Sequence, residues 1–145
     1  MTNNALPERL QEIVEDFGYC EGKEKLEYLL EFSERLPALP AWLEGKQNEM
    51  DQVHECMTPV FVYAENRDGK LYFHFDIPPE SPTVRGFASV LGEGINGSTP
   101  EEVLRIPSEF HLQMGLQMVL TDQRLNGVGA VLLHMKELAK KHRQG

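Results

Sequence analysis

The chain has 145 residues, of which 41% are hydrophobic and 26% are charged, and its 23 acidic residues outnumber its 14 Lys and Arg residues to give a formal net charge of -9. This acidic balance argues against a nonspecific nucleic-acid binder, which is normally basic, and no apolar run approaches the ~18 residues that a membrane span requires. The length and composition are typical of a single globular domain, which we expect to span residues 1–145.

The start of the chain, Met1-Thr2-Asn3-Asn4, lacks the charged and apolar regions of a secretory signal. The two cysteines of the chain are too few for a disulfide framework or for a four-cysteine metal site. We therefore expect a cytoplasmic protein whose thiols are kept reduced.

Two amphipathic helices are predicted at the beginning of the chain. The first carries apolar residues at helical spacing, namely Leu6, Leu10, Ile13, Val14 and Phe17. A break over residues 18–22 contains Cys20 among acidic neighbours, where we expect a structural thiol. A second helix is expected from about residue 23 to residue 36, where the following prolines end it, and residues 37–52 are predicted to form a loop.

A β-hairpin is predicted in the middle of the chain. Residues 58–64 and 70–77 are rich in β-forming side chains, and the Asp68-Gly69 pair between them is typical of a hairpin turn because glycine tolerates the positive φ that the turn demands. Alternation along the second strand places three apolar side chains on one face: Leu71, Phe73 and Phe75. Residues 53–54 (Val53 and His54) are expected to add a very short third strand.

Two further helices are predicted from the residues at their N-terminal ends. Ser81 offers a cap with Pro82 at the first helical position, and this helix is expected to run to about Leu91. Thr99 and Glu102 have the spacing of a capping box, so a short helix should follow Thr99.

The C-terminal third contains one ambiguous segment and one clear helix. Apolar residues alternate from Phe110 to Met118 as in a strand, but Phe110, Met114 and Met118 also have i, i+4 spacing, so strand and helix both remain open. The last helix has an apolar stripe that runs from Leu125 to Ala139. The predicted class is α+β, with N- and C-terminal helices packed around a small antiparallel sheet made of the hairpin and the short strand.

Two apparent ligand motifs are weak. Residues 92–97 fit G-x-G-x-x-G, but a dinucleotide site needs a strand before the glycines, whereas a predicted helix precedes them here and Glu93 would repel phosphate. We interpret this segment as a glycine-rich helix exit. His54 and Cys56 lie two residues apart, but zinc requires three or four clustered ligands, so we expect no metal site and no bound cofactor.

Cys56 is the strongest candidate for chemistry. It lies in V-H-E-C-M-T-P, residues 53–59, where a loop enters the predicted hairpin, so a fixed scaffold would hold it within reach of a partner. A protonated His54 would favour the nucleophilic thiolate, whereas Glu55 would disfavour it. From the residues alone, a reactive cysteine and an inert, half-buried thiol both remain open.

Four segments of the chain occur in an order that is typical of one family. F-S-E-R-L-P (residues 32–37) ends the N-terminal helical pair, and V-H-E-C-M-T-P-V-F-V (53–62) forms a cysteine loop followed by a strand. S-P-T-V-R-G-F-A-S-V-L (81–91) belongs to a central helix, and L-T-D-Q-R-L-N-G (120–127) begins the last one. Together they resemble the SufE family of sulfur-acceptor proteins, over roughly residues 6–141 of the chain.

The resemblance implies an α+β fold shared with IscU-like iron–sulfur scaffold proteins and helical structure in residues 108–118. It implies that Cys56 accepts sulfur from a SufS-type cysteine desulfurase, an enzyme that uses pyridoxal phosphate, and stimulates that enzyme. It further implies that the sulfur passes to a SufBCD-type scaffold complex, where iron–sulfur clusters are assembled.

The resemblance also bears on the residues around the cysteine. Arg124 and Gly127 match the family pattern and are expected to serve structure or docking, while His54 is a candidate supporting residue. Glu55 and Met57 stand where the usual family loop has a glycine and a polar residue, so the tightness of the turn and the acidity of the thiol can differ here.

The expected chemistry is persulfide exchange. The Cys56 thiolate would attack the outer sulfur of the desulfurase persulfide and displace the enzyme's thiolate, which requires one cysteine and no cofactor. An apolar shelter for the transferred sulfur is expected from Met57, Val60 and Phe61, and the loop must swing out to meet the partner.

Three other functions are considered. An iron–sulfur scaffold needs three or four ligands, usually cysteines, which Cys20 and Cys56 cannot supply alone. A cysteine hydrolase would need a base such as His74 or His111, which the spacing does not support. A non-catalytic adaptor with inert cysteines is the third. We predict a sulfur-transfer accessory protein rather than a stand-alone enzyme.

Overall fold

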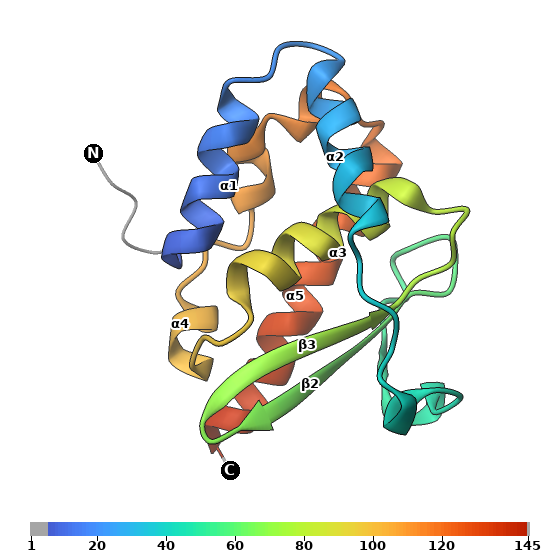
Figure 1. The fold of residues 1–145 in the computed structure, drawn as a ribbon, viewed down its shortest axis with the longest axis vertical. Helices are drawn as coiled ribbons and strands as arrows, with labels where there is room; N and C mark the ends of the chain where they lie inside the picture. Colours follow the sequence, from blue (N-terminus) through green and yellow to red (C-terminus); the bar gives the residue numbers. More distant parts are fainter. Residues whose placement is uncertain (1–5, 145) are drawn as a thin grey trace.

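The computed structural model describes residues 6–144, with side chains to residue 143, so the start of the chain, on which the expectation about a secretory signal rests, lies outside the described residues. Helices and strands occur in separate runs along the chain, with α1 and α2 before the strands and α3, α4 and α5 after them, as in an α+β fold (Figure 1), which confirms the predicted class. The regular elements are α1 (Glu8–Gly18), α2 (Glu24–Glu34), β1 (Asp51–Gln52), β2 (Phe61–Arg67), β3 (Lys70–Asp76), α3 (Pro82–Ile95), α4 (Pro100–Leu104) and α5 (Asp122–Gln144). Short 3-10 turns complete them: η1 (Ala41–Leu43), η2 (Gln47–Glu49), η3 (Phe110–Met114) and η4 (Leu116–Met118).

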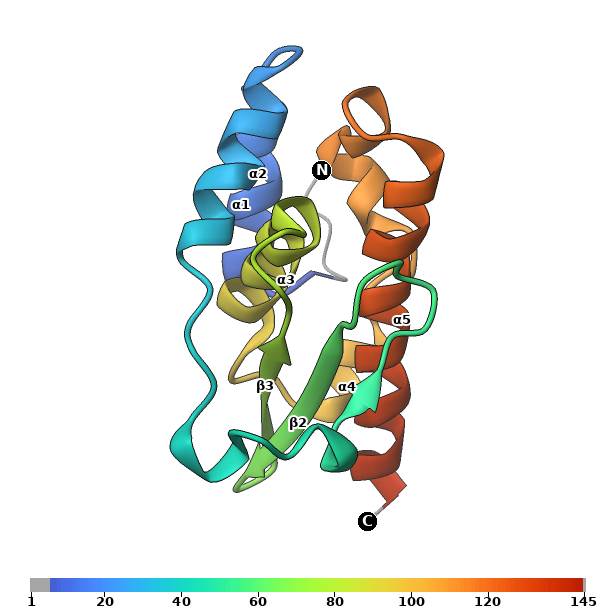
Figure 2. The ribbon, with the colours of Figure 1, turned by 90° about the vertical axis from the view of Figure 1, so that its right-hand side faces the viewer.

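The sheet is antiparallel, with strand order β1-β2-β3. Figure 2 shows α5 running along one face of the sheet, while the segment between α2 and β1 passes the other face. Trp42 of that segment packs edge-on against Tyr63 and His74. Helix α3 occupies the centre and packs against α1, α2 and α5. None of the described helices is both long and apolar enough to cross a membrane.

The hairpin forms as predicted. Asp68 and Gly69 have φ values of 52° and 87°, the positive pair that a type I′ turn requires. Strand β3 buries Leu71, Phe73 and Phe75 and leaves the alternate side chains less buried, which confirms its predicted faces.

The edges of the sheet differ from the prediction. The third strand is Asp51–Gln52 rather than Val53–His54, and β2 begins at Phe61 rather than near Thr58. After a last backbone hydrogen bond from Val53 N to Val60 O (2.8 Å), the chain leaves the ladder. Residues 54–59 therefore form a loop, which we call the Cys56 loop.

Helix α3 extends beyond its predicted end near Leu91. It runs through Gly92 and Gly94 to Ile95, so the glycine-rich segment is largely helical, and the exit lies at Gly97, which has φ 93°. Gly94 is required for packing, because a Cβ there would lie 2.7 Å from a methyl carbon of Leu10 in α1. The glycines thus allow two helices to approach closely, and they do not follow a strand as a dinucleotide-binding turn would.

Helix caps are partly as predicted. Thr99 and Glu102 form a complete capping box at α4, which confirms that prediction. Ser81 precedes α3, but its hydroxyl makes no cap; it instead shares a 2.6 Å hydrogen bond with the Thr58 hydroxyl of the Cys56 loop. The expected side-chain cap is therefore wrong, because the loop recruits the hydroxyl.

Residues 110–118 are helical, as the resemblance implied, and the alternative of a strand is wrong. They form the two 3-10 turns η3 and η4 on either side of Gly115, which has φ 76°. A Cβ at Gly115 would lie 2.8 Å from Cε of Lys25, whose ammonium donates to the carbonyls of Phe17 and Cys20. The segment therefore closes over the end of α1.

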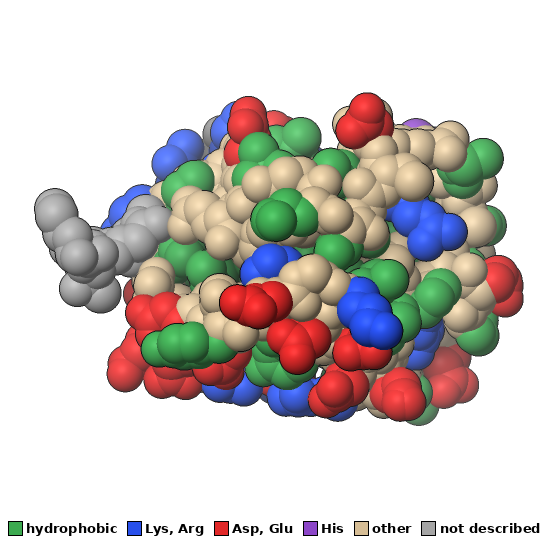
Figure 3. Space-filling model, turned by 90° about the horizontal axis from the view of Figure 1, so that it is seen from above, with side chains coloured by type: hydrophobic (Ala, Val, Ile, Leu, Met, Phe, Trp, Pro, Cys, Tyr) green, Lys and Arg blue, Asp and Glu red, His purple; other side chains and the backbone are tan. Residues whose placement is uncertain are grey.

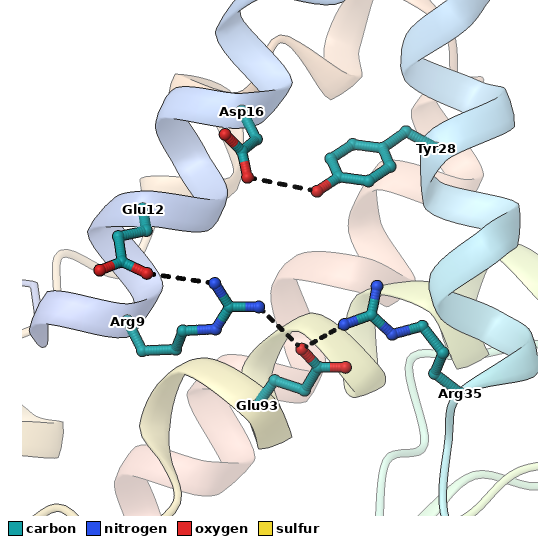
Figure 4. Close-up of polar contacts among 6 residues, drawn as sticks. All are labelled: Arg9, Glu12, Asp16, Tyr28, Arg35 and Glu93. Carbon is teal, nitrogen blue, oxygen red and sulfur yellow. Dashed lines mark hydrogen bonds and ion pairs between the residues drawn. The ribbon is translucent and has the colours of Figure 1, made fainter.

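Ion pairs join the three helices at one side of the molecule. Figure 4 shows Glu93 of α3 accepting hydrogen bonds from Arg9 of α1 (3.2 Å) and from Arg35 (2.7 Å), which follows α2. Each such exposed pair contributes less than about 1 kcal/mol, so the network orients the helices rather than holding the core. Figure 3 shows Asp and Glu side chains gathered along one edge of the face seen from above.

Candidate functional site

The Cys56 loop connects β1 to β2 and reaches across to α5 (Figure 2). Val53 and Val60 are buried at its two ends, which anchor it in the core. The Cys56 amide donates to the Val53 carbonyl (3.2 Å), so the backbone turns tightly just before the thiol. The loop is thus held by its ends and presents Cys56 between them.

The thiol of Cys56 packs against the second turn of α5. Its sulfur lies 3.7 Å from the carbonyl oxygen of Gly127, within reach of a weak S–H donor. A Cβ at Gly127 would lie 3.1 Å from the same sulfur, so a side chain there would press on the thiol. This close approach gives the physical reason for a glycine at the position that the resemblance singled out.

A cavity of about 240 Å³ opens beside the sulfur. The start of α3 supplies one wall with Thr83 and Val84, and the start of α5 supplies another with Arg124 and Gly127. Its volume is several times the ~30 Å³ that one water molecule occupies in the liquid, so it can accommodate an additional sulfur atom. Arg124 is exposed at the rim, where its guanidinium is free to meet a partner.

Burial, and to a smaller extent the neighbouring Glu55 carboxylate, raise the pKa of the Cys56 thiol to about 11. The thiol is therefore protonated at neutral pH in this conformation, and the closed loop protects it from reagents that attack thiolates. The structure places His54 on the exposed side of the loop, and its charge is not among the causes of the Cys56 shift. A supporting role for His54 stays a prediction.

The expected shelter for the sulfur is only partly correct. Met57 lines the cavity beside the sulfur, as expected, although its side chain is 80% exposed, whereas Val60 is buried and, like Phe61, does not line the cavity. Residues of α3 and α5 line much of the rest of the cavity. That part of the shelter comes from elements that follow the loop by some 25 to 70 residues, which local sequence could not reveal.

His134 is the functional candidate that sequence reasoning missed. It projects from α5 between two carboxylates: its Nδ1 lies 2.5 Å from Asp51 Oδ2, and its Nε2 lies 3.0 Å from Glu55 Oε1. Burial lowers the pKa of His134, but the hydrogen bonds to Asp51 and Glu55 outweigh this effect and raise the pKa above its usual value. Its partners lie 83 and 79 residues away in the chain, so spacing gave no signal.

The other candidate residues lie apart from this site. Cys20 lies in the turn between α1 and α2, where burial and then Glu24 raise the pKa of its thiol. His74 pairs with Glu65 (2.8 Å), and burial lowers the pKa of His111, which packs against Gly129. Within residues 6–143, no hydrogen bond joins the Cys56 sulfur to a histidine, and no cluster of three His, Cys, Asp or Glu side chains is arranged to hold a metal ion.

The chain was compared with known proteins. The family model described as "SufE: Fe-S metabolism associated domain" matches residues 11–139. An uncharacterized SufE-like protein of Mycobacterium tuberculosis is 38% identical over 133 residues, which cover 91% of this chain and 92% of that protein. A protein of Plasmodium vivax named "Cysteine desulfuration protein SufE" is 29% identical over 83 residues, covering 56% of this chain and 34% of the other.

A solved structure gives the same result for the fold. The solution structure of a hypothetical protein from Thermus thermophilus superposes with a TM-score of 0.84 at 35% sequence identity, and the match covers 97% of this chain and 99% of that one. A relative with more than 30% identity over nearly its whole length and a family model that spans most of the chain agree with each other. The chain belongs to the SufE family.

Proposed function

We propose that this protein accepts persulfide sulfur on Cys56 from a SufS-type cysteine desulfurase and delivers it for iron–sulfur cluster assembly. The single observation that supports this most is the placement of Cys56 beside a cavity, on a loop whose two ends are fixed in the core by Val53 and Val60. The family is associated with iron–sulfur metabolism, and the name of the Plasmodium vivax relative refers to cysteine desulfuration. The receiving complex in this proposal is of the SufBCD type.

The proposed step is a sulfur transfer without net oxidation or reduction. The desulfurase carries a persulfide on its own cysteine, and the Cys56 thiolate attacks the outer sulfur of that group. A new S–S bond forms at Cys56 while the S–S bond of the donor breaks, and the donor cysteine leaves as a thiolate. The proton that Cys56 loses ends on the departing donor, so atoms, charge and electrons balance.

The closed loop must open for this reaction. In the resting state the thiol is protonated and faces the Gly127 carbonyl rather than solvent. Because burial is the first cause of its raised pKa, moving the loop to a wetter position brings the pKa back toward its ordinary value. Closure after transfer would return the terminal sulfur to the cavity, away from reductants and oxidants.

Arg124 is assigned to docking in this proposal. Its exposed side chain lies at the cavity rim in the first turn of α5, one helical turn before Gly127. A guanidinium there attracts an anionic group of the partner and favours a persulfide anion over a neutral thiol. His54 is exposed on the loop and is accessible to a docked partner.

Desulfurase turnover tests the proposal. A desulfurase that must be unloaded turns over faster when an acceptor is present, so the wild-type protein should increase the rate of alanine formation from cysteine. Cys56→Ser should abolish the increase, and Cys20→Ser, which removes the other cysteine, should retain it. An unchanged rate with a proven partner enzyme would favour a non-catalytic adaptor.

The alternative of an iron–sulfur scaffold makes a different prediction. It requires a stoichiometric cluster after anaerobic reconstitution with iron and sulfide, lost in Cys56→Ser. The two cysteines lie in separate parts of the fold, one in the α1–α2 turn and one beside α5, so the sulfur-carrier proposal expects no such cluster.

A further inference from the structure

An ionic bridge outside the thiol cavity ties the Cys56 loop to the rest of the molecule. The His134 side chain of α5 contacts Asp51, at the edge strand β1, and Glu55, the residue immediately before Cys56. Its side chain is 21% exposed, so water screens this bridge only in part. The bridge therefore joins the helix to both the start and the middle of the chain segment that carries the thiol.

The geometry of the bridge requires a protonated imidazole. Asp51 faces Nδ1 and Glu55 faces Nε2, and both ring nitrogens can donate at once only in the imidazolium form. The charged groups that act on His134 are these two carboxylates, one from β1 and one from the loop. If His134 is neutral, one of the two nitrogens loses its proton and the contact it makes is lost.

The bridge acts together with the thiol contact. Gly127 and His134 are seven residues apart on α5, which is about two helical turns, so both face the same side of the helix. Helix α5 thus holds the loop at two points, the Cys56 sulfur against Gly127 and the Glu55 carboxylate against His134. Moving Cys56 away from the helix requires moving Glu55 as well, because the two residues are adjacent.

We propose that His134 is a positioning residue that latches the Cys56 loop closed through its bridge to Glu55. This inference rests on the proposed function, in which the loop must open before Cys56 can take up sulfur. A partner that withdraws Glu55 from His134, by offering its own cation, opens the loop without any change in the fold of the helices. Release of His134 is then part of the conformational cost of sulfur transfer.

The raised pKa of His134 determines how the latch depends on pH. The contact with Glu55 helps to raise the pKa of His134 in the closed state, so the bridge stabilises closure at pH values below the pKa that His134 has when the loop is open. This stabilisation is lost as the pH rises through the raised value. The latch is therefore strongest in mildly acidic solution and weakest in mildly alkaline solution.

The test measures how fast Cys56 reacts with 4,4′-dithiodipyridine in the absence of any desulfurase, in a Cys20→Ser background so that only one thiol reports. His134→Gln should react about fivefold faster than the parent at about pH 6, the effect expected for loss of a partly exposed charged contact. The ratio of the two rates should fall toward one at about pH 9, where the parent has lost its own latch. Using the ratio cancels the titration of the thiol itself.

The matched control is His142→Gln, the same substitution two turns further along α5. It should leave the rate unchanged at every pH. Asp51→Asn provides a second variant that keeps His134: it removes one of the groups that raise the pKa of His134, so the pH at which the parent latch is lost should move down.

The latch would be overturned by equal rates for His134→Gln and the parent at about pH 6, or by an equal acceleration in His142→Gln. If the pH at which the latch is lost is the same in Asp51→Asn as in the parent, the latch is overturned as well. This result can be obtained even if a thermal melt shows that His134→Gln does not fold. Because the reagent replaces the desulfurase, failure of sulfur uptake with a normal latch would count against the proposed function alone.

Discussion

The two cysteines of this protein lie in regions with opposite properties. Cys20 sits in the turn between α1 and α2, in a shallow surface lined by acidic side chains, and its sulfur lies 3.7 Å from the Asp16 carbonyl. Cys56 sits on a loop that is folded back onto α5, with its sulfur against Gly127 and a cavity beside it. In the proposed function the sheltered thiol is the sulfur carrier, because a carrier needs shelter between encounters and exposure only during them.

The largest expected contrast is in chemical reactivity. The pKa of Cys56, about 11, lies well above the ordinary cysteine value, so its thiolate fraction at about pH 8 is roughly 100-fold lower than normal. The greater nucleophilicity of a more basic thiolate restores part of this loss, which leaves a deficit of about tenfold. Because the pKa of Cys20 is itself raised, iodoacetamide should label Cys20 faster than Cys56 in the isolated wild-type protein by less than about tenfold, as measured by peptide mass spectrometry.

A substitution in α5 should reduce the difference in labelling rate between Cys20 and Cys56. In Gly127→Ala the new Cβ would lie 3.1 Å from the Cys56 sulfur, so either the loop or the helix must shift by a few tenths of an ångström. The loop has no regular secondary structure and yields more easily than the helix, so the labelling rate of Cys56 should rise roughly threefold.

Gly129→Ala is the matched control, because the added Cβ on the same helix meets His111 at 3.0 Å rather than the thiol. It should leave Cys56 labelling unchanged. If Gly129→Ala accelerates labelling as much as Gly127→Ala, the effect comes from the helix in general and the close contact with Gly127 is not what protects the thiol.

The smallest expected effect concerns the labelling rate of Cys20. Burial raises the pKa of Cys20 first, and the charge of Glu24 raises it next. Glu24→Gln removes that charge from an exposed site, so Cys20 labelling should increase only about twofold, and less at high salt. Cys56 labelling should not change, and a parallel change at Cys56 would mean that the two regions are not independent.

Local patterns explain which features could be predicted from the sequence. The hairpin follows from Asp68-Gly69 between β-forming runs, and the α4 capping box follows from Thr99 and Glu102, since both depend on residues within a few positions of one another. The edge strand was misplaced by two residues because its position is set by pairing with β2, for example Asp51 with Val62. The end of α3 was misjudged because Gly94 serves packing against Leu10, far away in the chain.

In the candidate site, too, single residues could be predicted from the sequence, whereas contacts between distant residues could not. Cys56 was singled out from its place before the hairpin and from the family resemblance, and Gly127 from the resemblance alone. The contact between them, 71 residues apart, and the bridge from His134 to Glu55 arise only when α5 packs against the sheet. Met57 lines the cavity as expected, but Val60 and Phe61 do not, because residues of α3 and α5 from distant parts of the chain supply the other walls.

The most direct test of the central claim is to map sulfur after the protein is incubated with its cysteine desulfurase and cysteine. A bound sulfur adds about 32 Da to the peptide that carries it. The account predicts this mass on the Cys56 peptide, although Cys56 is the less reactive thiol in the isolated protein, and it predicts that Cys20→Ser retains the addition while Cys56→Ser loses it. Sulfur found mainly on Cys20, following simple thiol reactivity, would contradict the account.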